Sequence, residues 1–162
     1  MSAGSVSTDS AGPGGCCCGP SGGKLFRQGR LVTTAAVAYQ EGRFFAAQRK
    51  KTGAQPLRWE FPGGKCDEGD PDERSCLERE FREEFGVSVT VGDEAGSIPF
   101  DHKGVSYVLV GYWVQIPPEP LVLREHVQAG WYTPKELLEL DLSDSDRSLV
   151  KEILPLVESS RR

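Results

Sequence analysis

The sequence predicts an α+β fold. Segments rich in Val, Ile, Thr and aromatic residues, typical of strands, mix with a few helical segments, and the two kinds do not strictly alternate. The chain has 162 residues, of which 38% are hydrophobic, and this composition suits one domain with a core of its own.

Six segments are bounded by turn residues, as expected of strands. They cover residues 31–39, 43–48, 59–61, 87–91, 105–116 and 127–132. The first two are joined by a turn at Glu41-Gly42, and the third ends at Pro62-Gly63-Gly64, because proline and glycine interrupt strands. Prolines at 117, 118 and 120 close the longest strand.

Three segments are predicted to be helices, over residues 72–85, 134–140 and 143–158. The first ends before Gly86, the residue type preferred at the left-handed position after a helix. The last begins with Ser143, and Asp146 follows it at the spacing of a capping pattern.

Residues 1–24 differ in composition from the rest of the chain. Gly, Ser, Ala, Pro and Cys fill this segment, so it has too little apolar surface to offset the entropy cost of ordering. We predict a disordered tail at 1–24 and a folded domain over 25–162. Cys16, Cys17 and Cys18 lie in this tail, and inert residues, acylation sites and a redox or metal patch all remain open as their role.

Cysteine usage and net charge narrow the class of protein. The five cysteines are odd in number and show no Cys-x-x-Cys spacing, so we expect no disulfide framework and a reducing compartment. The N-terminal residues lack the pattern of a secretory signal, which indicates the cytoplasm, with an organelle as the alternative. The net charge of -5 and the absence of a long apolar run argue against nucleic-acid and membrane partners.

The helix predicted over 72–85 gathers acidic side chains at the border of its apolar face. The apolar positions are Leu77, Phe81 and Phe85, and the acidic ones are Glu80, Glu83 and Glu84. On a helical wheel the centre of the acidic set lies only about 110° from the centre of the apolar set. Like charges at this spacing repel. A hard divalent cation such as Mg²⁺, which prefers carboxylate oxygens, would compensate them, and a solvated face paired with Arg79 is the alternative.

This segment resembles the signature of Nudix hydrolases, in which a glycine and a later acidic residue precede Arg-Glu-apolar-x-Glu-Glu-x-Gly-apolar. Residues 79–87 match the second part at every position. Upstream, Asp70 stands where the family has Glu, and its spacing to Arg79 is one residue longer, which we place in the loop over 70–73. In the family this residue mainly orients the segment, so the departure affects geometry more than metal binding.

The resemblance covers most of residues 31–154 and is nearest to the MutT-like branch, which includes 8-oxo-dGTP diphosphatases and CTP pyrophosphohydrolases. It implies the Nudix fold, in which a mixed β-sheet lies between α-helices, and Mg²⁺ as cofactor, with Mn²⁺ as the alternative. The metal ligands that it implies are the carbonyl of Gly63 and the carboxylates of Glu80, Glu83, Glu84 and Glu125. The substrate-binding residues that it implies are Arg49, Glu60, Phe61, Pro62, Gly63 and Asp146.

Several of these positions also have a purely structural interpretation. Arg49 would then be a cation at a strand end, Phe61 a core side chain and Asp146 a residue that favours a helix N-terminus. Glu125 would be a loop carboxylate beside His126.

The activity implied by the resemblance is Mg²⁺-dependent hydrolysis of a nucleoside triphosphate to a monophosphate and pyrophosphate. The chemistry would use Glu80, Glu83 and Glu125, and we consider Glu80 and Glu125 as the base that takes the proton from water. The substrate indicated first is 8-oxo-dGTP, because Asp146 can accept hydrogen bonds from base N–H groups.

CTP or a modified dCTP is the alternative substrate, since cytosine also carries an amino group. A catalytically weak Nudix domain that binds a nucleotide or a protein is the rival from another class. We expect a monomer or weak dimer whose partner is a small nucleotide.

Overall fold

The computed structural model describes residues 23–160. The predicted tail at 1–24, with its three cysteines, lies almost entirely outside these residues. Within 23–160 the chain forms three helices and eight strands. Their bounds are β1 Phe26–Arg27, β2 Arg30–Val37, β3 Tyr39–Gln40, β4 Arg43–Arg49, β5 Trp59–Glu60, α1 Glu73–Phe85, β6 Thr90–His102, β7 Val105–Gln115, β8 His126–Tyr132, α2 Pro134–Glu139 and α3 Asp144–Ser159.

The described strands form two four-stranded sheets. The first has the order β1-β2-β7-β6, and it is mixed because β2 and β7 run parallel, from Leu31 opposite Tyr107 to Val37 opposite Trp113. In the second, β3, β5 and β8 all pair antiparallel with β4. The sheets bring the short strand β5 and the start of β8 next to the end of β4.

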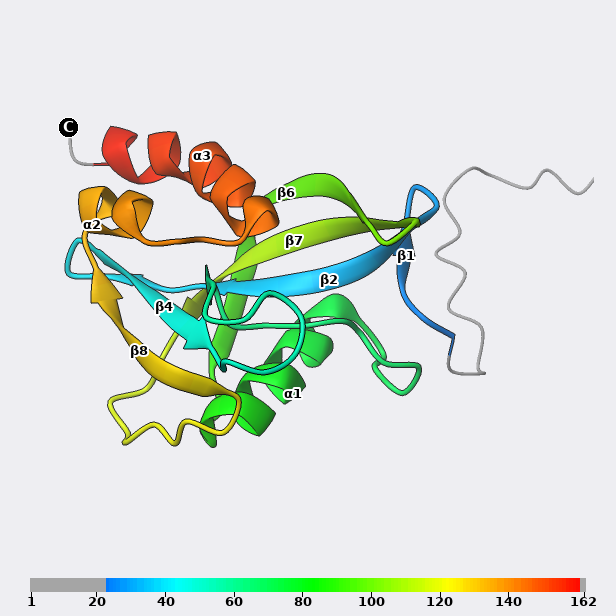
Figure 1. Cartoon of the computed structure of the whole chain (residues 1–162), viewed down its shortest axis with the longest axis horizontal. Helices are drawn as coiled ribbons and strands as arrows, with labels where there is room; N and C mark the ends of the chain where they lie inside the picture. Colours follow the sequence, from blue (N-terminus) through cyan, green and yellow to red (C-terminus); the bar gives the residue numbers. More distant parts are fainter. Residues whose placement is uncertain (1–22, 161–162) are drawn as a thin grey trace, which may run out of the picture.

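Helices cover the sheets on both sides, with α1 on one side and α2 and α3 on the other (Figure 1). Each side has its own hydrophobic cluster. Leu77, Phe81 and Phe85 of α1 lie in one cluster, and Leu149 and Ile153 of α3 lie in the other. This layered arrangement confirms the α+β class and the sheet between helices expected of the Nudix fold.

Helix α1 forms where the sequence places it. The side chain of Asp72 caps its N-terminus by accepting a hydrogen bond from the amide of Ser75 at 2.7 Å. Gly86 ends the helix with a φ of 74°, which glycine adopts without steric cost.

The structure differs from the prediction between residues 87 and 102. In place of a strand over 87–91, β6 runs over Thr90–His102 and pairs with β7 as the edge of the mixed sheet. Its register shifts on either side of Glu94. Glycines and a proline weaken the strand pattern in this segment, and an edge strand with bulges tolerates them.

The structure also contains a disulfide bond that the sequence analysis did not expect. Cys66, in the loop after Gly64, is bonded to Cys76 of α1, and their Cα atoms are 5.3 Å apart. The sequence predicted no disulfide framework, and neither the number nor the spacing of the cysteines indicated this pair. Separately, none of the helices within 23–160 has the length and apolar character needed to cross a membrane.

Candidate active site

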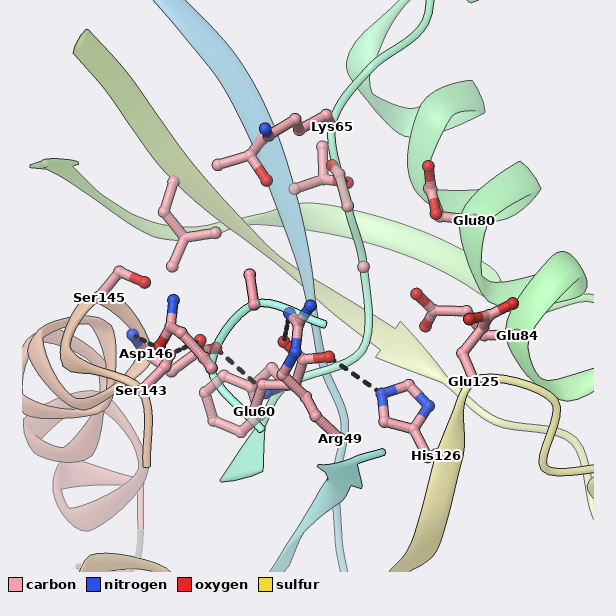
Figure 2. A pocket seen from close by; sticks show the side chains of 18 of the residues that line it. Arg49, Glu60, Lys65, Glu80, Glu84, Glu125, His126, Ser143, Ser145 and Asp146 are labelled. Carbon is pink, nitrogen blue, oxygen red and sulfur yellow. Dashed lines mark hydrogen bonds and ion pairs between the residues drawn. The ribbon is translucent and has the colours of Figure 1, made fainter. Parts of the chain in front are cut away.

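A cavity of about 540 Å³ opens between α1, the strands β4, β5 and β8, and the start of α3 (Figure 2). Most of the predicted site residues line it. These are Arg49, Glu60, Phe61, Gly63, Glu80, Glu83, Glu84, Glu125 and Asp146. One end of the cavity is formed by the carboxylates of α1 and the other by the N-terminal turn of α3.

The carboxylates at the α1 end lie in an environment that disfavours their charge. Figure 2 shows Glu80 and Glu84 projecting from α1 near Glu125 of the loop before β8. Burial, followed by the negative charges of Glu60, Glu80 and Glu125, raises the pKa of Glu84 to about 9. Burial also raises the pKa of Glu80.

These carboxylates fit a hard divalent cation. The Oε2 atom of Glu84 is buried and has no hydrogen-bond partner among residues 23–160. A buried carboxylate oxygen without a partner is costly, and a cation beside it removes that cost. Because all the side-chain donors are carboxylate oxygens, Mg²⁺ matches them better than a soft metal would.

Two glycines let the loop backbone pass closely between β2 and this acidic cluster. A Cβ atom on Gly63, whose φ is 150°, would lie 2.1 Å from the carbonyl oxygen of Thr34. A Cβ atom on Gly64 would lie 2.7 Å from the carboxylate carbon of Glu80. The amide of Gly63 donates a hydrogen bond to Glu84, so the loop backbone lies directly beside the carboxylates.

Pro62 is the predicted site residue that the structure does not place on the cavity wall. Its side chain is fully buried, and its carbonyl accepts a hydrogen bond from the amide of Ala36 at 2.7 Å. The Pro62 carbonyl thus joins this segment to β2, and a contact between Pro62 and a substrate stays a prediction from the resemblance.

Asp70 orients α1 despite its unusual spacing. Arg79 donates from Nε and Nη2 to the two oxygens of Asp70, each at 2.8 Å, and holds the pKa of that carboxyl below its usual range. The same guanidinium lies 3.2 Å from Glu80 and 3.1 Å from Glu83. The ion pair between Asp70 and Arg79 thus ties the longer loop to α1, which fits the orienting role that the resemblance implied.

Asp146 lies at the opposite end of the cavity, in the first turn of α3. It is buried, and its Oδ1 atom accepts a hydrogen bond from the amide of Phe61 at 3.0 Å. The hydroxyl of Ser143 donates to its other oxygen. Burial, followed by the negative charge of Glu60, raises the pKa of Asp146 to about 7.

Glu60 lies between the two ends of the cavity and receives a donor on each oxygen. Arg49 Nη1 is 3.1 Å from Oε2, and His126 Nε2 is 2.9 Å from Oε1. No spacing in the sequence links His126 to Glu60, so the sequence marks His126 only as the neighbour of Glu125. The fold joins them by pairing β5 and β8 with β4.

Other lining residues lay outside the predicted set. Polar and aromatic side chains come from several segments that only the fold brings together: Lys50, Thr52, Gln55, Lys65, Phe100, His102, Tyr107, Ser143 and Ser145. Of these, His102 ends β6.

Known proteins resemble this chain in both sequence and fold. The chain is 34% identical over 126 residues to the CTP pyrophosphohydrolase of Escherichia coli, an alignment that covers 78% of this chain and 93% of the relative. It is 32% identical over 117 residues to the putative 8-oxo-dGTP diphosphatase 2 of Mycobacterium tuberculosis, covering 70% of this chain and 81% of the relative. The solution structure of the E. coli ORF135 protein superimposes with a TM-score of 0.69 at 31% identity, over 80% of this chain and 91% of that one.

A family as a whole matches about the same part of the chain as these pairwise similarities. Residues 29–153 match the family described as the NUDIX domain, and this range contains both the carboxylate helix α1 and Asp146. The chain therefore belongs to the Nudix family.

Proposed function

We propose that this chain is a Mg²⁺-dependent nucleoside triphosphate pyrophosphohydrolase that acts on oxidised purine nucleotides such as 8-oxo-dGTP. The observation that carries the proposal is that the two ends of one cavity differ in chemistry. Carboxylates suited to a divalent cation lie at one end, the carboxylate of Asp146 lies at the other, and the carboxylate of Glu60 lies between them. A nucleotide has the same two ends, a polyanion and a base.

The residues that would hold Mg²⁺ are Glu80, Glu83, Glu84, Glu125 and the carbonyl of Gly63. When bound, the metal neutralises the triphosphate and lowers the pKa of the attacking water. The candidates for the base that takes the proton of that water are Glu80 and Glu125. Glu80 is fixed beside Arg79 and Gly64, whereas Glu125 lies on an exposed loop.

Attack at the β-phosphorus would give a nucleoside monophosphate and pyrophosphate, as the family resemblance implies. Arg49 would contribute a positive charge near the nucleotide, and it is partly engaged by Glu60. The ring of Phe61 packs 6.1 Å from the ring of Phe44, and the backbone amide of Phe61 donates a hydrogen bond to Asp146 in the pocket.

The acceptor groups at the base end favour a base rich in N–H donors. Oxidation of guanine at C8 places a hydrogen on N7, in addition to the N1–H and the exocyclic amino group. Asp146 and Glu60 can accept from such groups. The M. tuberculosis relative, named a putative 8-oxo-dGTP diphosphatase, supports this assignment.

CTP, or a modified dCTP, is the second candidate substrate. The observation that favours it is the 34% identity to the E. coli CTP pyrophosphohydrolase over nearly the whole of that relative. The exocyclic amine of cytosine would donate to the same carboxylates. A monomer or weak dimer and a cytoplasmic location stay predictions from the sequence.

The test is pyrophosphate release by the purified protein with Mg²⁺ at low micromolar substrate. We would compare 8-oxo-dGTP, dGTP, CTP and 5-methyl-dCTP. Preference for 8-oxo-dGTP supports the proposal, whereas preference for the cytidine compounds moves the assignment to the second candidate. Release from none of them would refute both and leave the nucleotide- or protein-binding module. Glu78→Gln is the control, because Glu78 is on α1 but does not line the cavity.

A further inference from the structure

The two oxygens of Glu60 are held by two side chains that come from opposite positions on the paired strands β4 and β8. Arg49 at the end of β4 and His126 at the start of β8 are register partners, and the register shifts between Gln48 and Arg49. Such an irregularity turns a side chain away from its regular direction. The result is that Arg49 and His126 each bind one oxygen of the same carboxylate.

The two partners of Glu60 differ in rigidity. The side chain of His126 is 2% exposed, and its ring stacks on Phe85 of α1 with 5.2 Å between ring centroids and 9° between planes. The side chain of Arg49 is 38% exposed and has more rotatable bonds. His126 is therefore the fixed reference for the carboxylate, whereas Arg49 can move with solvent or substrate.

Packing alone does not account for an imidazole at this position. A carboxylate oxygen only accepts hydrogen bonds, so Nε2 of His126 donates to Glu60. The other ring nitrogen, Nδ1, is buried without a hydrogen-bond partner among residues 23–160. An apolar ring would fill this space without leaving a polar atom unsatisfied. The contact that distinguishes His126 is therefore its bond to Glu60.

Glu60 is the group whose position matters to both ends of the cavity. Its negative charge raises the pKa of Glu84 at the α1 end and the pKa of Asp146 at the α3 end. A carboxylate held by a single exposed arginine would rotate, and its two acceptor oxygens would no longer present one fixed pattern to a base.

We propose that His126 is a positioning residue that fixes the Glu60 carboxylate for recognition of the nucleobase. This inference rests on the proposed function, because it assumes that a base occupies the part of the cavity between Glu60 and Asp146. It assigns no contact between His126 and the substrate. It predicts that base selectivity depends on the bond between His126 and Glu60.

The test measures base selectivity without requiring turnover. Dissociation constants for 8-oxo-dGMP, dGMP, CMP and UMP are determined by titration calorimetry on the full chain, and the readout is the ratio between the tightest and the weakest ligand. His126→Phe keeps an aromatic ring against Phe85 and removes the donor, and we expect it to lower the ratio roughly tenfold or more. His126→Gln keeps an N–H donor and should restore most of the ratio. Gln128→Ala, on the same strand but outside the cavity, is the matched control.

A double-mutant cycle separates positioning from stability. If His126 acts through Glu60, His126→Phe should change the ratio little when Glu60 is already Gln. A ratio unchanged by His126→Phe, or an equal loss in the Phe and Gln variants that follows their melting temperatures, would overturn the inference. A wild-type protein without base preference would also overturn it. Failure to release pyrophosphate is a separate result, which refutes the proposed activity while the binding ratios still decide the role of His126.

Discussion

Replacing Glu84 by Gln should stabilise the metal-free protein at neutral pH. The side chain is 8% exposed, and burial is the largest cause that raises its pKa to about 9 from an ordinary value of 4.5. Between these two pH values the folded state binds a proton that the unfolded state has lost. A group that is protonated only in the folded state makes the free energy of unfolding fall as pH rises.

The size of this effect follows from the two pKa values. Each pH unit within this window lowers the free energy of unfolding by about 1.4 kcal/mol. Between pH 4.5 and about pH 7.5 the total is at most about 4 kcal/mol for this one group. Because a Gln side chain does not ionise, the Glu84→Gln variant lacks this loss and should exceed the wild type by up to that amount at about pH 7.5.

Urea denaturation in EDTA between about pH 5 and pH 8 is the assay. The pKa of Asp146 is also raised, to about 7, so Asp146 adds to the pH dependence of both proteins. The contribution of Glu84 is therefore the difference in free energy of unfolding between wild type and variant at each pH. Glu78→Gln should keep the wild-type slope. Addition of Mg²⁺ should stabilise the wild type and not the Glu84→Gln variant. A variant that is less stable than the wild type in EDTA at pH 7.5, or that keeps its pH dependence, would refute the reasoning.

Three further results are expected. Glu83→Gln should lower Mg²⁺-dependent turnover by about 100-fold or more, because it removes a metal ligand. The circular dichroism spectrum should stay the same, because the Glu83 side chain is 59% exposed, and retained activity would remove Glu83 from the metal ligands. Asp146→Ala should change the ranking of nucleotides in kcat/KM more than it changes the Mg²⁺ concentration for half-maximal rate, and an unchanged ranking would remove Asp146 from the base pocket. Reduction of the Cys66–Cys76 bond should lower the free energy of unfolding by about 3 kcal/mol, as measured by urea denaturation with and without reductant, and no change would mean that the bond does not form in solution.

Local sequence signals predicted the helix that carries the acidic cluster. Asp72 and Gly86 have chemistry that suits a helix start and end, and they define α1 in the structure. The position of the carboxylates beside the apolar face follows from helical periodicity, and the buried Glu84 lies where that periodicity places it.

The features that the sequence analysis missed depend on contacts between distant segments. The strand β6 contains glycines and a proline, and only its pairing with β7 makes it a strand. The bond between Cys66 and Cys76 depends on how the loop folds back onto α1, which ten residues of separation do not specify. The same holds for His126 and Glu60, which are 66 residues apart and meet through strand pairing.

The most direct measurement of the proposed activity is ³¹P NMR of the products formed from 8-oxo-dGTP. With Mg²⁺ we expect 8-oxo-dGMP and pyrophosphate in equal amounts. With EDTA we expect neither, and in the Glu83→Gln variant we expect both to form about 100-fold more slowly or less. Orthophosphate in place of pyrophosphate, or the same turnover in EDTA, would contradict a metal-dependent pyrophosphohydrolase built on the carboxylates of α1.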